Sequence, residues 1–197
     1  MTELFFLLKI TLAESSPEIW RKFVVPKSIS LDRLHDVIQI VMGWQDYHQH
    51  EFVFGEKHFT EFPQKGDPFN PSSKAVLGKL VKRKGATFSY IYDWGDDWTH
   101  ELVVEETKVD PRLIREPLFC TAGERACPPE DVGGIFGYQE FCEAMSKPKH
   151  PRHKELKEWY GKPLDAEYFN PALVNQELVK YWRWSRDRVL NWNQFPV

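Results

Sequence analysis

The strongest constraint on the fold is a stretch in which two runs of strand-forming residues flank an acidic turn. The first run covers residues 88–92 (FSYIY) and the second covers residues 102–104 (LVV), and both are rich in aromatic or β-branched side chains. Between them, residues 94–98 (WGDDW) supply one glycine and two adjacent aspartates, which are typical of a turn. The pattern predicts a β-hairpin.

The rest of the chain predicts an α+β fold. Residues 3–12 and 19–25 are apolar runs joined by a short polar loop, so we expect two antiparallel strands. Residues 31–42 have helical periodicity between an N-cap, Ser30, and a stop, Gly43. The element order favours a mostly antiparallel, β-grasp-like sheet with helices packed on one face and a C-terminal helical annex. Further helices are expected at 137–145, 155–160 and 171–190.

Length and composition indicate one domain spanning residues 1–197, with a core at 1–108 and an irregular loop and helical annex at 109–197. The formal net charge of −3 argues against a generally basic, nucleic-acid-binding surface. No basic stretch precedes the first apolar run, and no apolar run reaches about 18 residues. We therefore expect a soluble protein with neither a signal peptide nor a membrane span.

The acidic turn is the first candidate binding site. Residues 93–106 hold six acidic side chains and no Lys or Arg. Such carboxylates can hold a divalent cation, although Asp beside Gly in a turn also bonds to its own backbone. If residues 98–104 form a strand, Trp98 and His100 face one side and Glu101 the other. The candidate ligand-binding residues here are Asp93, Trp94, Asp96, Asp97, Trp98, His100 and Glu101.

A second candidate lies in residues 110–136, whose Pro and Gly content predicts an ordered but irregular excursion. Within it, the lobe, residues 123–134 (GERACPPEDVGG), combines four ionisable groups with paired glycines that permit close backbone approach. We expect the lobe to meet the acidic turn, with Arg125 pairing to an aspartate of the turn. If Arg125 instead points away, the acidic cluster is free to bind a cation or a basic partner. The candidate residues of the lobe are Glu124, Arg125, Glu130 and Asp131.

The cysteines and histidines do not specify a metal site by spacing. Cys120 and Cys127 are too far apart for a zinc pair, and with Cys142 they predict reduced thiols and a cytoplasmic location. His48 and His50 form an H-x-H pattern that can bind metal, but no further ligands lie nearby, so we expect a surface pair. No metal ligand is assigned from the sequence.

Basic residues concentrate in the basic segment, residues 74–84 (KAVLGKLVKRK), which has five cations and no acidic residue. It predicts a short helix with one apolar side. Residues 180–188 (KYWRWSRDR) interleave aromatic and basic residues, which suits base stacking or, alternatively, an amphipathic helix packed on the sheet. Contact with nucleic acid would use Lys79, Lys82, Arg83 and Lys84.

Two long motifs resemble the plasmid pRiA4b ORF-3-like family, also described as an IS1096 passenger protein of TnpR type. They are residues 92–101 (YDWGDDWTHE) and the lobe, which is followed by Gly137-Tyr138. The resemblance covers about residues 3–175 and implies an α+β fold and a link to mobile elements. The family's sequence pattern is also resembled by three shorter segments, Leu34-His35, Gly43-Trp44 and His50-Glu51-Phe52.

Three functions are consistent with these features. The first is a binding module for a small ligand or protein, with the turn and lobe as its polar site and Trp94 and Trp98 as apolar walls. The second is a metal-dependent hydrolase of phosphoesters, with carboxylates holding the metal and His100 as general acid or base. The third is a nucleic-acid-associated accessory factor. Nucleotide-binding, zinc-protease and serine-hydrolase motifs are absent from the sequence.

Overall fold

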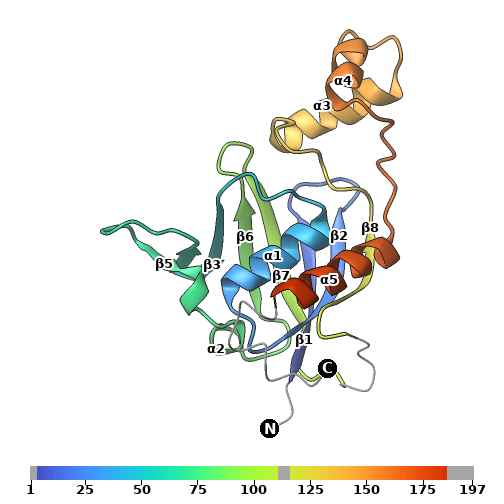
Figure 1. Cartoon of the computed structure of the whole chain (residues 1–197). Coiled ribbons are helices and arrows are strands. Elements are labelled where there is room, and N and C mark those ends of the chain that lie inside the picture. Colours follow the sequence, from blue (N-terminus) through green and yellow to red (C-terminus); the bar gives the residue numbers. More distant parts are fainter. Residues whose placement is uncertain (1–3, 111–115, 186–197) are drawn as a thin grey trace.

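The computed structural model describes residues 4–110 and 116–185, which form a mostly antiparallel sheet with helices (Figure 1). The eight strands lie in the order β5-β4-β3-β6-β7-β1-β2-β8, and only β4 and β5 pair in parallel. The strands are β1 Phe5–Leu12, β2 Trp20–Pro26, β3 His50–Phe54, β4 Lys57–Thr60, β5 Phe69–Pro71, β6 Thr87–Tyr92, β7 Trp98–Glu106 and β8 Phe119–Glu124. The helices are α1 Leu31–Met42, the 3-10 turn η1 Ser72–Lys74, α2 Leu77–Leu80, α3 Gly134–Ser146, α4 His153–Tyr160 and α5 Pro171–Ser185.

The first half of the chain confirms the expected arrangement. Strands β1 and β2 pair antiparallel, and so do β6 and β7 of the central hairpin. Helix α1 begins after Ser30 and ends at Gly43, whose φ of 106° is readily adopted only by glycine. Its apolar stripe is buried, because residues such as Leu34 and Ile38 pack into the core against the sheet.

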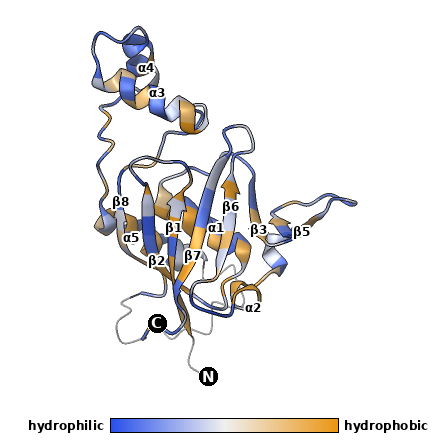
Figure 2. Ribbon diagram, turned by 180° about the vertical axis from the view of Figure 1, so that it is seen from behind, coloured by the Kyte–Doolittle hydropathy of each residue, from blue (hydrophilic) through white to orange (hydrophobic). Residues whose placement is uncertain are grey.

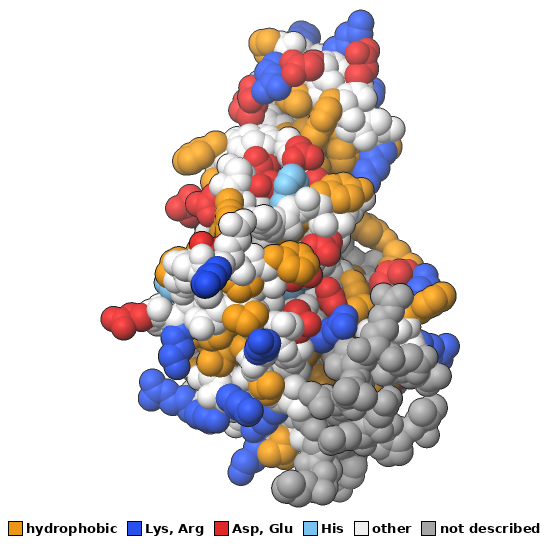
Figure 3. All heavy atoms as spheres, turned by 60° about the vertical axis from the view of Figure 1, so that its left-hand side comes forward, with side chains coloured by type: hydrophobic (Ala, Val, Ile, Leu, Met, Phe, Trp, Pro, Cys, Tyr) orange, Lys and Arg blue, Asp and Glu red, His pale blue; other side chains and the backbone are white. Residues whose placement is uncertain are grey.

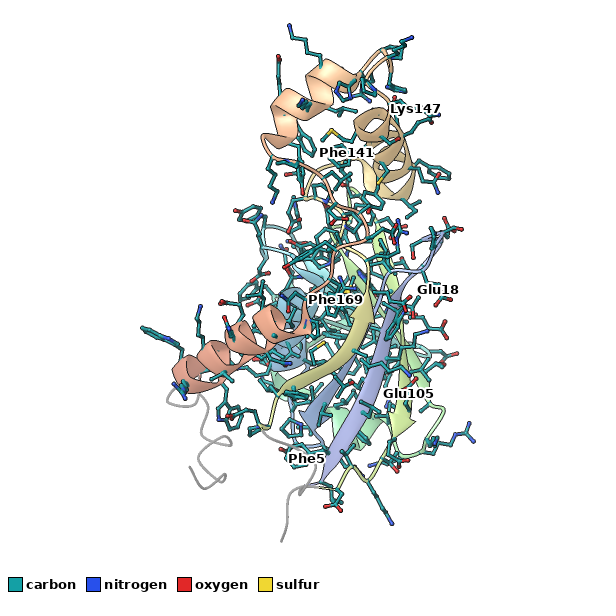
Figure 4. All side chains as sticks on the ribbon, turned by 90° about the vertical axis from the view of Figure 1, so that its right-hand side faces the viewer. Phe5, Glu18, Glu105, Phe141, Lys147 and Phe169 are labelled. Atoms are coloured by element: carbon teal, nitrogen blue, oxygen red, sulfur yellow. The ribbon has the colours of Figure 1, made fainter. Side chains whose placement is uncertain are left out.

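Helices cover one face of the sheet. Helix α1 contacts β2, and α5 packs against both β8 and α1 (Figure 1). Seen from behind, no helix of the described residues lies over the opposite face (Figure 2). Helices α3 and α4, here called the annex, project beyond one end of the sheet. Phe141 lies within the annex, whereas Phe169 lies where the chain returns to the sheet, with its ring 4.1 Å from the guanidinium carbon of Arg21 (Figure 4).

Three expectations need correction or limitation, and a fourth is confirmed. Residues 119–124 are not irregular but form β8, because the free edge of β2 supplies backbone partners that the sequence cannot reveal. The basic segment holds only the four-residue helix α2. The final helix is described to Ser185, so residues 186–190 lie outside the described part, as do the basic residues beyond that point. The three cysteines are free thiols, as expected.

Within residues 4–110 and 116–185, no helix has both the length and the apolar character that crossing a lipid bilayer requires.

Candidate functional site

The turn between β6 and β7, residues 93–97, is held by its own polar groups. Asp93 adopts a φ of 56°, a left-handed conformation that Asp tolerates better than most residues. Its Oδ1 accepts a hydrogen bond from the Gly95 N–H at 2.8 Å, and its carbonyl accepts one from the Asp97 N–H at 2.7 Å. These bonds fix the Asp93 carboxylate, which is buried, and leave Oδ2 free to face outward from the turn.

The pairing of β3 with β6 brings His48 to this turn. His50 lies opposite Tyr92, so the residues just before His50 run alongside those just after Tyr92. The Asp93 N–H donates to the Gln49 carbonyl at 2.9 Å, which extends this pairing by one step. His48 is therefore positioned by strand register, and its Nε2 lies 3.5 Å from Asp93 Oδ2.

The lobe is fastened to the other side of the turn. The Gly133 N–H donates to Asp96 Oδ2 at 3.0 Å. Gly134 has a φ of 66°, and a Cβ placed there would lie 2.6 Å from the Asp96 carbonyl oxygen, so only glycine fits without displacement. At the start of the lobe, the buried guanidinium of Arg21 donates to the carbonyls of Glu124 and Arg125, both at 2.7 Å.

These three segments converge on a cluster composed of His48, Asp93, Glu130 and Asp131. From His48 Nε2, the nearest carboxylate oxygens are Asp131 Oδ1 at 3.1 Å, Asp93 Oδ2 at 3.5 Å and Glu130 Oε2 at 4.0 Å. The Asp131 side chain is 66% exposed, so the cluster opens to solvent on that side. The space-filling view shows a histidine among acidic side chains, with hydrophobic side chains nearby (Figure 3).

Two buried atoms of the cluster have no hydrogen-bond partner, namely His48 Nε2 and Glu130 Oε2. The Glu130 side chain is only 8% exposed. Its other oxygen, Oε1, is fully engaged, because the Gln45 N–H donates to it at 2.7 Å and the Tyr92 hydroxyl at 3.1 Å. Glu130 thus has one oxygen held by the protein and one buried oxygen directed at the cluster without a hydrogen-bond partner.

The spacing of the cluster suits a metal ion. Ligand atoms about 2.1 Å from a metal lie about 3–4 Å from one another, depending on the coordination geometry. One ligand atom each from His48, Asp93 and Asp131 lies within 4.8 Å of the other two. The hydrogen bonds to the second oxygens of Asp93 and Glu130 resemble the outer contacts that orient metal-binding carboxylates.

The electrostatics of the cluster are unbalanced without a cation. Burial raises the pKa of the Glu130 carboxyl, and the neighbouring Asp131 adds to this effect. Among the described residues, no Lys or Arg forms an ion pair with the cluster. Burial also raises the pKa of the Tyr92 hydroxyl well above its usual range, so Tyr92 remains a hydrogen-bond donor to Glu130.

The structure brings only some of the sequence-predicted residues to the cluster. Asp93, Glu130 and Asp131 belong to it, and Asp96 lies beside it through its bond to Gly133. Several others lie on its periphery or are used elsewhere. Asp97 accepts from Thr99, half-exposed Trp94 stacks near Phe69, and the Glu124 carboxylate accepts from the Trp20 indole.

Three further candidates lie away from the cluster. Trp98 is buried and packs against Trp44, with ring centroids 5.3 Å apart, so it is not a wall of the site. His100 is fully buried, so it has no access to solvent or substrate as an acid or base. Burial also lowers its pKa to about 4. Glu101 is exposed on the opposite face of β7, as the alternation of the strand predicts.

The expected pairing of Arg125 with the turn is wrong. Its guanidinium forms an ion pair with Glu167, on the segment that returns from the annex. Arg125 has a φ of 67°, and this left-handed backbone together with the Arg21 bond to its carbonyl directs the side chain away from the turn. The turn and the lobe nevertheless meet in space, as expected.

His48 and His50 do not form a surface pair. His50 is buried and stacks on His35, with ring centroids 3.6 Å apart, whereas His48 joins the cluster. Sequence reasoning also missed Tyr92, Gln45 and the buried Arg21. The alternation of His48 and His50 was a usable signal, but β3 begins at His50, so His48 lies outside the strand.

The model of the plasmid pRiA4b ORF-3-like protein family matches residues 5–175. The chain belongs to this family. It is 40% identical over 175 residues to the uncharacterized protein y4hQ of Sinorhizobium fredii, covering 88% of each chain. A crystal structure of a protein of unknown function, MM3350 of Methanosarcina mazei Go1, matches with a TM-score of 0.78 and 33% identity, covering 87% of this chain and 98% of that one. The family assignment and the α+β fold therefore agree with the sequence motifs.

Proposed function

We propose that this pRiA4b ORF-3-like protein is a binding module whose site holds a divalent metal ion between the turn and the lobe. The ligands would be His48 Nε2, Asp93 Oδ2, Glu130 Oε2 and Asp131 Oδ1. The observation that carries the proposal is the buried Oε2 of Glu130, which faces the cluster and has no hydrogen-bond partner. A cation at the centre would compensate this oxygen and the two neighbouring carboxylates.

The donor set favours a first-row transition metal. Carboxylates suit Mg²⁺, Ca²⁺ and Mn²⁺, whereas imidazole suits Zn²⁺, Fe²⁺ and Ni²⁺. One imidazole with three carboxylates therefore favours Mn²⁺, Fe²⁺ or Zn²⁺ over Ca²⁺ and Mg²⁺. Because the ligands must be deprotonated, binding should release protons and weaken as the pH falls.

The test is calorimetric titration of the chelator-treated full chain with Mn²⁺ and Zn²⁺, with Mg²⁺ as a comparison. We expect stoichiometric binding of at least one transition metal. Glu130→Gln keeps an oxygen for the Gln45 and Tyr92 hydrogen bonds but replaces the free oxygen with an amide nitrogen. This variant should weaken binding by at least about 10-fold, as even outer contacts of metal ligands commonly contribute that much.

The matched control is Asp97→Asn, which removes one negative charge from the same turn without touching the cluster, since the Asp97 side chain accepts from Thr99. It should retain the wild-type affinity. Absence of stoichiometric binding of either transition metal would refute the proposal. Equal weakening by Glu130→Gln and Asp97→Asn would show only a diffuse attraction of cations to acidic charge.

A second candidate, a metal-dependent phosphoester hydrolase, is favoured by the exposure of Asp131. A metal held there would have an open side where a bound water could ionise near neutral pH and attack a substrate. Buried His100 would have no part in it. Release of p-nitrophenol from p-nitrophenyl phosphate, dependent on metal and lost in Glu130→Gln, would support hydrolysis. Metal binding without turnover would refute the hydrolase and support only the binding module.

A further inference from the structure

The charge of this chain is strongly segregated. Between Asp67 and Asp93, the chain carries five basic residues, all in the basic segment, and no acidic one. The formal net charge is −3 for the whole chain and +5 for this stretch, so the remainder carries −8. This stretch is thus a local region of an overall acidic protein where anions would be attracted, distinct from the cluster of His48, Asp93, Glu130 and Asp131.

The fold holds this region rigidly. Leu77 and Val81 are buried, so the cations between and after them face solvent. The backbone is tied to the start of α1, because the Leu31 N–H donates to the Ala75 carbonyl and the Leu77 N–H to the Ile29 carbonyl, both at 2.9 Å. The exposed cations are Lys74, Lys79, Lys82, Arg83 and Lys84.

Within the described part of the chain, most of these cations have no acidic partner. Among residues 4–110 and 116–185, the ion pair formed by the basic segment is Lys84 Nζ with Glu106 Oε2 at 3.7 Å, and Lys82 Nζ donates to the Gly78 carbonyl at 2.8 Å. In the space-filling view, Lys and Arg side chains gather over the lower part of the face, whereas acidic side chains surround the histidine above them (Figure 3). Unpaired cations on a fixed backbone favour a polyanionic partner.

The composition of the segment indicates which polyanion. Residues 74–84 contain no aromatic side chain, so they offer no platform on which the bases of a single strand could stack. They also contain no Ser, Thr, Asn or Gln, the neutral hydrogen-bonding side chains suited to the 2′-hydroxyls of RNA. The basic segment therefore offers a partner only positive charge. We propose that the basic segment is a docking surface for the phosphate backbone of double-stranded DNA, bound without sequence preference.

Fluorescence anisotropy of the full chain with a labelled DNA duplex of mixed sequence tests this proposal. With about five phosphates neutralised, log K should fall against log salt with a slope of about −4 to −5. The triple variant Lys79→Glu, Lys82→Glu, Arg83→Glu should weaken binding at low salt by at least about 10-fold and reduce the slope to about −2. These three side chains are exposed, so the fold should be retained.

The matched control reverses three lysines in and just after α4, Lys154→Glu, Lys157→Glu and Lys162→Glu, which changes the net charge equally. It should leave the affinity within about twofold of wild type. The proposal is overturned if the duplex does not bind at low salt, if both triple variants lose affinity equally, or if single-stranded DNA or duplex RNA binds more tightly. Because no metal ligand is altered, the result is independent of metal binding.

Discussion

Protonation of His100 should make the fold sensitive to acid. This side chain is fully buried against Trp44 and Tyr90, and its Nδ1 lies 3.3 Å from the Tyr90 carbonyl oxygen. Burial lowers its pKa to about 4, with the charge of nearby Arg21 acting in the same direction. In the unfolded chain, histidine titrates near 6.5. The folded protein therefore favours the neutral ring, and its stability contribution is complete above about pH 6.5 and is lost as the pH falls.

The magnitude follows from the two pKa values of His100. At about pH 5, the unfolded chain binds nearly one proton at this residue and the folded chain almost none. The resulting loss in unfolding free energy is about 2 kcal/mol relative to about pH 8. His50, whose pKa burial lowers to about 2, acts in the same direction. Asp36 and Glu130, whose pKa values burial raises, act in the opposite direction, so the contribution of His100 must be isolated by a variant.

The assay is urea unfolding at about pH 8 and about pH 5, applied to wild type and His100→Phe. His100→Phe keeps an aromatic ring in the core and removes the titrating group. Wild type should lose about 2 kcal/mol more than His100→Phe between the two pH values.

The reasoning would be refuted if wild type and His100→Phe lost the same free energy, within about 0.5 kcal/mol, between the two pH values. That result would mean that the His100 ring is either protonated in the fold or accessible to water. If His100→Phe folds poorly at about pH 8, His100→Gln provides the same comparison without a titrating ring.

Three further substitutions test the attachment of the lobe. Arg21→Met leaves buried carbonyls unpaired, each costing about 1–3 kcal/mol, so urea unfolding should show a loss of at least about 3 kcal/mol; a loss below about 1 kcal/mol would contradict this. Gly134→Ala places a Cβ against the Asp96 carbonyl and should weaken metal binding in the calorimetric titration, whereas unchanged affinity would show that the lobe does not need this close approach. Arg125→Ala removes the ion pair with exposed Glu167 and should change stability by no more than about 1 kcal/mol in urea unfolding, because Glu167 stays in water. A larger loss would indicate that Arg125 supports the lobe directly.

Local patterns determined much of the fold. Helix α1 has the expected bounds because its apolar spacing, Ser30 and Gly43 act within one stretch of chain. The central hairpin was equally predictable, since its strands and turn are adjacent in sequence. The burial of Trp98 and the exposure of Glu101 on opposite faces followed from strand alternation.

Long-range pairing decided the rest. Strand β8 exists because the edge of β2 is free, which the residues of β8 cannot signal. His48 reaches Asp93 only through the register of β3 against β6, and Asp131 reaches both through the Gly133 and Gly134 contacts with the turn. The sequence identified two acidic motifs. That His48 lies between them, and that Arg125 does not, depends on the packing of segments far apart in the chain. Each side chain can take several partners, and only the tertiary structure selects one.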